Sequence, residues 1–159
     1  MATITKLKVR NEPQWGDACG NAWAGKFRFE TNASGYYVNS DTPAAAVGIA
    51  DVVRIGILPA GLDIHESIQI VSDAFTATST FDIGFAYVDG VDSAAVPQNA
   101  AYFANDLATT AGITRKTAST APVVLPKDAY LTILNNTAAQ NAVGVIDIIV
   151  QGIWTGIPS

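Results

Sequence analysis

The stretch from Asp51 to Gly90 constrains the fold of this chain most, because its apolar residues recur mostly at every second position. The alternation runs through three segments separated by two turn signals, without a helical period. Its apolar positions are Val53, Ile55, Ile57, Leu62, Ile64, Ile68, Ile70, Phe81, Ile83, Phe85 and Tyr87. A period of two is typical of β-strands. The stretch therefore predicts three strands whose apolar face packs against a second sheet.

The opposite face of these strands is predicted to meet water or a neighbouring protein. Its residues are Arg54, Gly56, Asp63, His65, Ser67, Gln69, Asp82 and Gly84. His65 is the chain's single histidine, so a Ser-His-Asp triad would have to use it. Because it lies in the middle of a predicted strand, we interpret it as a solvated or interface-facing residue.

The later part of the chain repeats the same strand pattern. An apolar segment at Pro122–Leu125 leads through a turn opened by proline into an alternating segment at Ala129–Asn135. Val143–Gly152 is a longer apolar segment, with Ile146, Ile148 and Val150 on one face. Its length and apolar density predict a central position in a sheet.

About eight strands emerge from this pattern, with at most one short helix. The helix is predicted where Ala100, Phe103 and Leu107 lie three and four residues apart. Such a count predicts an all-β fold, a two-layer antiparallel β-sandwich. We favour a jelly-roll arrangement over an immunoglobulin-like one, because the Cys…Trp…Cys spacing is absent. Residues 1–23 are expected to form an N-terminal arm and loop, and residues 24–159 a single sandwich domain.

The charge of the chain limits its partners. Hydrophobic residues make up 49% of the sequence and charged residues only 14%, so little surface is solvated by charge. This composition indicates a surface that partners cover. A net charge of −5 argues against nucleic-acid binding, which requires clustered lysines and arginines. No apolar run has the length of a signal peptide or a membrane span, so we expect a soluble protein that is not exported.

Neither an enzyme nor a cofactor site is predicted. Cys19 is the chain's single cysteine and is interpreted as a packing residue. One histidine and one cysteine do not meet the usual ligand requirement of a transition metal. Asp89 and Asp92 could suit a weak calcium site, although a hairpin turn is the favoured interpretation. No glycine-rich nucleotide motif occurs.

Basic and aromatic residues near the N-terminus are the predicted partner contacts. They are Lys6, Lys8, Arg10, Trp15, Trp23, Tyr36 and Tyr37. The basic residues belong to a segment that either reaches a neighbouring protein or forms an edge strand protected by lysines. The aromatic rings either cap the core, anchor a protein partner or stack on sugars.

The chain resembles head proteins of tailed bacteriophages in three runs: VVRIGILPAGLDIHESIQI, TSTFDIGFAYVDG and VVLPKDAYLTIL. The family comprises the small decoration or cement proteins, and related minor structural proteins, that coat an assembled capsid. The resemblance covers Asp51–Gly90 well and Pro122–Gly152 more loosely.

The resemblance implies a structural virion protein without enzymatic activity or cofactors. It would be made in the host cytoplasm, bind the major capsid protein at the outer capsid surface and cement neighbouring subunits. It would act as a homo-oligomer, with a trimer expected before a dimer. Neither nucleic acid nor membrane is an expected partner. The alternative is a carbohydrate-binding sandwich, and a hydrolase is the weakest hypothesis because of the single histidine.

Overall fold

The computed structural model describes residues 1–5, 21–42, 44–118 and 120–156. These residues form ten β-strands and no helix. The strands are β1 (Thr3–Thr5), β2 (Ala22–Thr31), β3 (Val52–Leu58), β4 (Leu62–Asp73), β5 (Thr80–Tyr87), β6 (Asn99–Ala108), β7 (Gly112–Arg115), β8 (Val123–Val124), β9 (Ala129–Asn135) and β10 (Gly144–Trp154). The all-β prediction is confirmed, with two strands more than expected. None of the described segments forms a helix that could cross a membrane.

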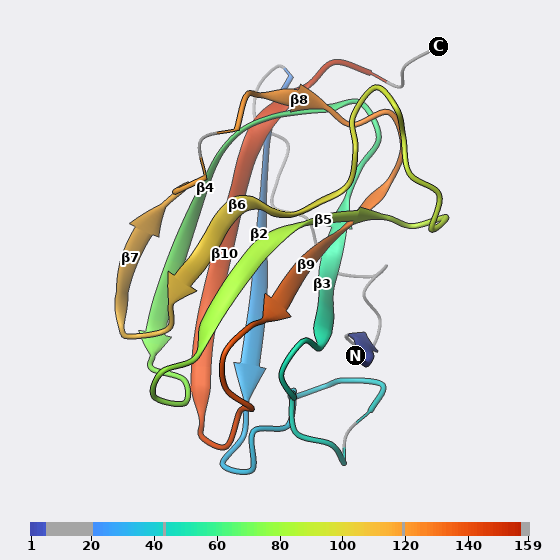
Figure 1. The fold of residues 1–159 in the computed structure, drawn as a ribbon. Helices are drawn as coiled ribbons and strands as arrows, with labels where there is room; N and C mark the ends of the chain where they lie inside the picture. Colours follow the sequence, from blue (N-terminus) through green and yellow to red (C-terminus); the bar gives the residue numbers. More distant parts are fainter. Residues whose placement is uncertain (6–20, 43, 119, 157–159) are drawn as a thin grey trace.

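The strands form two sheets that face each other as layers (Figure 1). Sheet 1 has the order β1-β3-β9-β5-β6, and sheet 2 has the order β2-β10-β4-β7, with β8 also paired to β4. Every described strand pair is antiparallel except β1 with β3. The predicted two-layer antiparallel sandwich is therefore confirmed, whereas its jelly-roll character remains a prediction.

The period of two places the core as predicted on strands β5 and β10. The inward side chains of β5 are all buried, and so are Ile146, Ile148 and Val150 of β10. Strand β10 pairs with β2 on one side and β4 on the other, which confirms its predicted central position. Burial of these side chains between the sheets is the main source of stability, at about 25 cal/mol per Å² of apolar surface.

A β-bulge in β3 overturns part of the predicted alternation. Arg54 pairs with Thr132 and Gly56 with Leu131 of β9, so Ile55 is an extra residue on β3. The extra residue shifts the alternation by one position. Gly56 is consequently buried, while Ile57, predicted to lie on the inner face, points outward opposite Tyr130.

Strand β4 contains two such shifts, beside His65 and Ser72. Between them Ser67 and Gln69 point into the sandwich and are fully buried, whereas Ile68 and Ile70 point outward. The predicted facing of these four residues is therefore wrong. Gln69 Nε2 donates a hydrogen bond to Ser67 Oγ at 2.7 Å, but Gln69 Oε1 has no partner among the described residues. An unpaired buried acceptor costs about 1–3 kcal/mol.

The segment predicted to be a short helix is strand β6. Its pairing with β5 contains two irregularities, so its buried residues do not alternate. The Phe103 carbonyl accepts from the Thr117 backbone N–H at 3.1 Å, and the Tyr102 carbonyl accepts from Thr120 Oγ1 at 2.9 Å. The three- and four-residue spacing that predicted a helix therefore lies in a distorted strand. This strand also contacts the β7–β8 connection.

Residues 3–5 form the short edge strand β1 beside β3. Ile4 is buried, and the Thr5 N–H donates to Asp41 Oδ1 at 2.9 Å. At the other end of the strand the Ala2 N–H donates to Asp51 Oδ1 at 2.7 Å. These contacts favour the edge-strand interpretation for the first residues. The proposed boundary between arm and sandwich at residue 23 remains a prediction.

Candidate partner-binding surface

Three of the seven predicted contact residues lie in the described part of the chain. Trp23 is 9% exposed and Tyr37 is 3% exposed, and both belong to the core. The Tyr37 ring meets the Phe29 ring edge to face, with centroids 5.0 Å apart. Tyr36 is only partly exposed. The burial of Trp23 and Tyr37 favours the core-capping interpretation over that of a partner anchor.

The other four predicted contact residues lie outside the described residues, together with Cys19. These four are Lys6, Lys8, Arg10 and Trp15. Their contact role remains a prediction.

His65 lies at the bulge in β4 and pairs with a carboxylate. Its Nε2 is 3.1 Å from Asp63 Oδ2. Ser67, which simple alternation would place beside His65, instead points into the sandwich and bonds with Gln69. Ser67 is therefore not placed to serve as a hydroxyl nucleophile beside this histidine.

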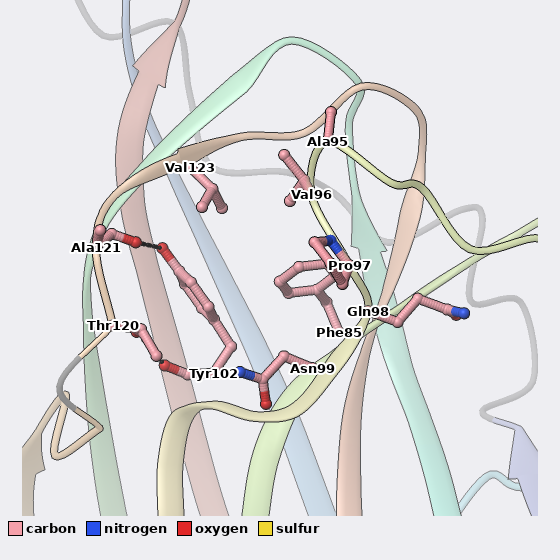
Figure 2. Close-up of a pocket in the computed structure, with 10 residues that line it drawn as sticks. All are labelled: Phe85, Ala95, Val96, Pro97, Gln98, Asn99, Tyr102, Thr120, Ala121 and Val123. Atoms are coloured by element: carbon pink, nitrogen blue, oxygen red, sulfur yellow. Dashed lines mark hydrogen bonds between the residues drawn. The ribbon is translucent and has the colours of Figure 1, made fainter.

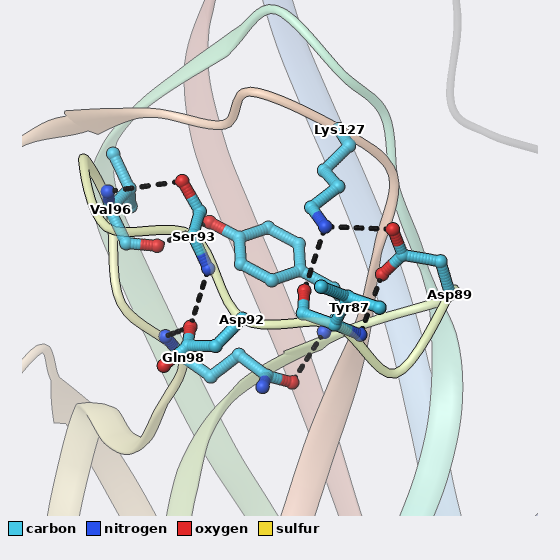
Figure 3. Close-up of polar contacts among 8 residues, drawn as sticks. Tyr87, Asp89, Asp92, Ser93, Val96, Gln98 and Lys127 are labelled. Carbon is cyan, nitrogen blue, oxygen red and sulfur yellow. Dashed lines mark hydrogen bonds and ion pairs between the residues drawn. The ribbon is translucent and has the colours of Figure 1, made fainter.

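The β5–β6 loop is held by internal polar contacts (Figure 3). Lys127 Nζ donates to Asp89 Oδ2 and to the Val91 carbonyl, each at 2.7 Å. The hydrogen bond from Lys127 lowers the pKa of Asp89. Asp92 Oδ1 accepts from the backbone N–H groups of Ser93 at 2.8 Å and Gln98 at 2.7 Å.

Both carboxylates of the predicted turn are therefore engaged within the protein. An ammonium group at Asp89 disfavours a divalent cation at the same oxygens, because like charges repel. Within the described ranges, no group of three or more His, Cys, Asp and Glu side chains is placed to hold a metal ion. The turn at Asp89 and Gly90 is present, and the Gly90 N–H donates to the Tyr87 carbonyl at 3.1 Å.

A pocket of about 360 Å³, lined in part by this loop, lies at the end of the sandwich that carries β8 (Figure 2). The rings of Phe85 and Tyr102 and the side chains of Val96, Pro97 and Val123 form its apolar lining. The Tyr102 hydroxyl donates to the Ala121 carbonyl at 2.8 Å. The shape and lining suit an uncharged apolar group.

Among the described residues, the pocket lining contains no Asp, Glu, Lys, Arg or His. Burial, followed by the charge of Asp63, raises the pKa of Tyr102 to about 12. The phenol therefore stays protonated at neutral pH and acts as a structural hydrogen-bond donor. This lining offers binding through apolar contact and no acid or base poised for proton transfer near pH 7.

The outer face of sheet 2 carries a group of apolar side chains that we call the isoleucine face: Ile68, Ile70, Ile113 and Ile149. Ile149 lies directly opposite Ile68, and Ile70 lies directly opposite Ile113. Ile113 is 73% exposed, and the other three are partly exposed. Contiguous exposed apolar side chains of this kind mark contact surfaces more often than single ones do.

Asp147 borders the isoleucine face and is held by two cations. Its carboxylate accepts from Arg28 Nε at 2.9 Å and from the Arg28 guanidinium NH2 at 3.0 Å. Lys26 Nζ is 3.2 Å from the same carboxylate. The Arg28 hydrogen bonds are the largest cause that lowers the pKa of Asp147. On the other side of the isoleucines, Arg115 Nη1 lies 3.8 Å from Glu66 Oε2.

Sequence reasoning missed both the isoleucine face and the pocket. The two faces of β4 cannot be assigned without the bulges, and the pocket joins segments from β5, β6 and the β7–β8 connection. The alternation of Lys26 and Arg28 with Phe27 and Phe29 is a sequence signal that places charge on the outer face of sheet 2.

Comparison with known proteins gives matches at the level of structure. No protein-family model matches the sequence, and no curated protein matches it. A chain in the capsid of Ralstonia phage GP4 superposes with a TM-score of 0.64 at 16% identity, covering 98% of this chain and 99% of that chain. A chain in the capsid asymmetric unit of cyanophage Pam1 gives 0.53 at 14% identity, covering 96% and 98%. Over nearly its whole length, this chain therefore shares its fold with one chain in each of two phage capsids.

Proposed function

We propose that this protein is a structural component of a bacteriophage virion. It binds the major capsid protein at the outer capsid surface and cements neighbouring subunits as a homo-oligomer. The observation that carries the proposal is the end-to-end match with a chain of the GP4 phage capsid, at 98% and 99% coverage. Because both chains are almost fully covered, the match extends over this chain from end to end.

The surface chemistry supports the same proposal. The chain has few charged residues, and its described surface carries apolar side chains on the outer face of sheet 2. Repeated contacts on a symmetric lattice add up through avidity, so that each contact can be weak. Such a structural protein needs surfaces that bind neighbouring proteins, and it does not need an active site.

Sedimentation with capsids tests the proposal. Purified protein is mixed at micromolar concentration with capsids of its phage that lack it, and the capsids are pelleted. We expect saturable co-sedimentation and a higher temperature of capsid disassembly. Capsids that are already fully decorated serve as the control and should take up no more protein. Protein that remains in the supernatant with undecorated capsids would refute the proposal.

The carbohydrate-binding alternative has less support. A sugar-stacking platform needs exposed aromatic rings, whereas Trp23 and Tyr37 lie in the core. Of the described candidates, only Tyr36 is partly exposed.

A further inference from the structure

We propose that the isoleucine face is the surface that docks on the capsid shell, against an apolar shell surface bordered by carboxylates. The inference rests on the proposed function and adds the binding face and the chemistry of its partner. It is carried by the register of β4, the exposure of the isoleucines and the charges beside them.

The register of β4 places apolar and polar residues against the usual preference. Uninterrupted alternation from Leu62 and Ile64 would bury Ile68 and Ile70 and expose Ser67 and Gln69. The extra residue at His65 reverses this facing and leaves Gln69 Oε1 without a partner among the described residues. Bulges re-aim side chains and often occur at functional sites. The core therefore contains Ser67 and Gln69 in place of Ile68 and Ile70. These two isoleucines instead lie on the outer face, where they supply half of the isoleucine face.

Cations stand on both sides of the isoleucines. Ile149 and Ile68 share one cross-strand row with Lys26 on β2 and Arg115 on β7. The Asp147 side chain is only 9% exposed, against 38% for Lys26 and 52% for Arg28, so the cations are the more accessible charges at that edge. Arg115 Nη1 lies 3.8 Å from Glu66 Oε2, but the Arg115 side chain is the more exposed of the two, at 71% against 37%. The rows beyond contain carboxylates, namely Glu30, Asp73, Glu66 and Asp63. A complementary partner therefore has an apolar centre with carboxylates at its two sides.

The same charges disfavour a second copy joined through this face. A two-fold axis parallel to the strands would place β2 of one copy over β7 of the other, and Lys26 over Arg115. An axis across the strands would place Arg28 over Lys26. Both symmetric arrangements bring like charges together, which costs binding energy.

The test compares two matched double variants in capsid sedimentation. Ile68→Thr with Ile149→Thr removes the centre of the isoleucine face, and threonine keeps the β-branched shape that strands favour. Ile57→Thr with Leu134→Thr makes a comparable change on the outer face of sheet 1, where both side chains are partly exposed. Arg115→Glu reverses one bordering charge. Urea unfolding establishes that each variant is folded.

We expect the first double variant and Arg115→Glu each to weaken capsid binding about tenfold or more, as central contacts do. The sheet 1 variant should bind like the unchanged protein. Equal binding by all variants would overturn the docking face and leave the proposed function intact. Absence of binding by the unchanged protein would refute both. Light scattering that shows an oligomer dissociated by the first double variant would identify a second copy as the occupant and overturn the inference.

Discussion

At the scale of single residues, two charged groups, Asp147 and Lys127, each connect neighbouring segments on a surface with few charges. Asp147 joins two neighbouring strands, because its partners Arg28 and Lys26 belong to β2 while Asp147 itself belongs to β10. Lys127 similarly ties the β5–β6 loop to the segment before β9. Both contacts join segments that are distant in sequence.

We predict that Asp147→Asn lowers the free energy of unfolding by about 1 kcal/mol at pH 7, because the exposed cations are partly screened. The pKa of Asp147 is lowered in the folded protein. Its contribution is therefore complete above the unfolded-state pKa of about 4 and disappears as pH falls through the lower folded-state value. Urea unfolding should show a difference between the variant and the unchanged protein that is smaller at pH 3 than at pH 7.

The matched control is Asp73→Asn on the same sheet, since Asp73 is exposed and its carboxylate has no ion pair or hydrogen bond with any described residue. Its substitution should leave stability almost unchanged at both pH values. A difference for Asp147→Asn that persists undiminished at pH 3 would contradict the assigned role of the carboxylate.

At the scale of elements, β4 shows how a strand can satisfy the period of two over short segments and break it over its whole length. Its ends follow the predicted facing at Leu62 and Ile64, and its middle reverses it. The reversed segment places Ser67 and Gln69 in the core. There Gln69 Nε2 donates a hydrogen bond to Ser67 Oγ, whereas Gln69 Oε1 has no partner among the described residues.

We predict that the double variant Ser67→Ala with Gln69→Met is at least as stable as the unchanged protein. Replacing both partners of a poorly satisfied buried pair by apolar groups of similar size removes the desolvation cost without leaving a new orphan. The urea midpoint should stay the same or rise. Ser67→Ala alone is the control. It should be less stable than the unchanged protein, because it removes the acceptor of the Gln69 Nε2 hydrogen bond. A double variant less stable than this single one would contradict the prediction.

At the scale of the whole molecule, charged residues make up only 14% of the sequence, so an interface between copies would hide surface that a monomer has to solvate. We predict a homo-oligomer in solution, with a trimer expected before a dimer. Light scattering at several concentrations measures the mass directly. A trimer would fit three-fold capsid positions and a dimer two-fold positions. A mass of one chain, 16.6 kDa, at all concentrations would contradict the prediction.

The sequence by itself determined the fold class and the central position of β10. Alternation and turn residues are properties of short segments, and they predict strands wherever they occur. Only the tertiary structure decided which way Ile57, Ile68 and Ile70 face, and that the segment around Phe103 is a strand. Bulges arise from register with neighbouring strands, and the pocket joins distant segments. The candidate surface therefore became visible only after the sheets were paired.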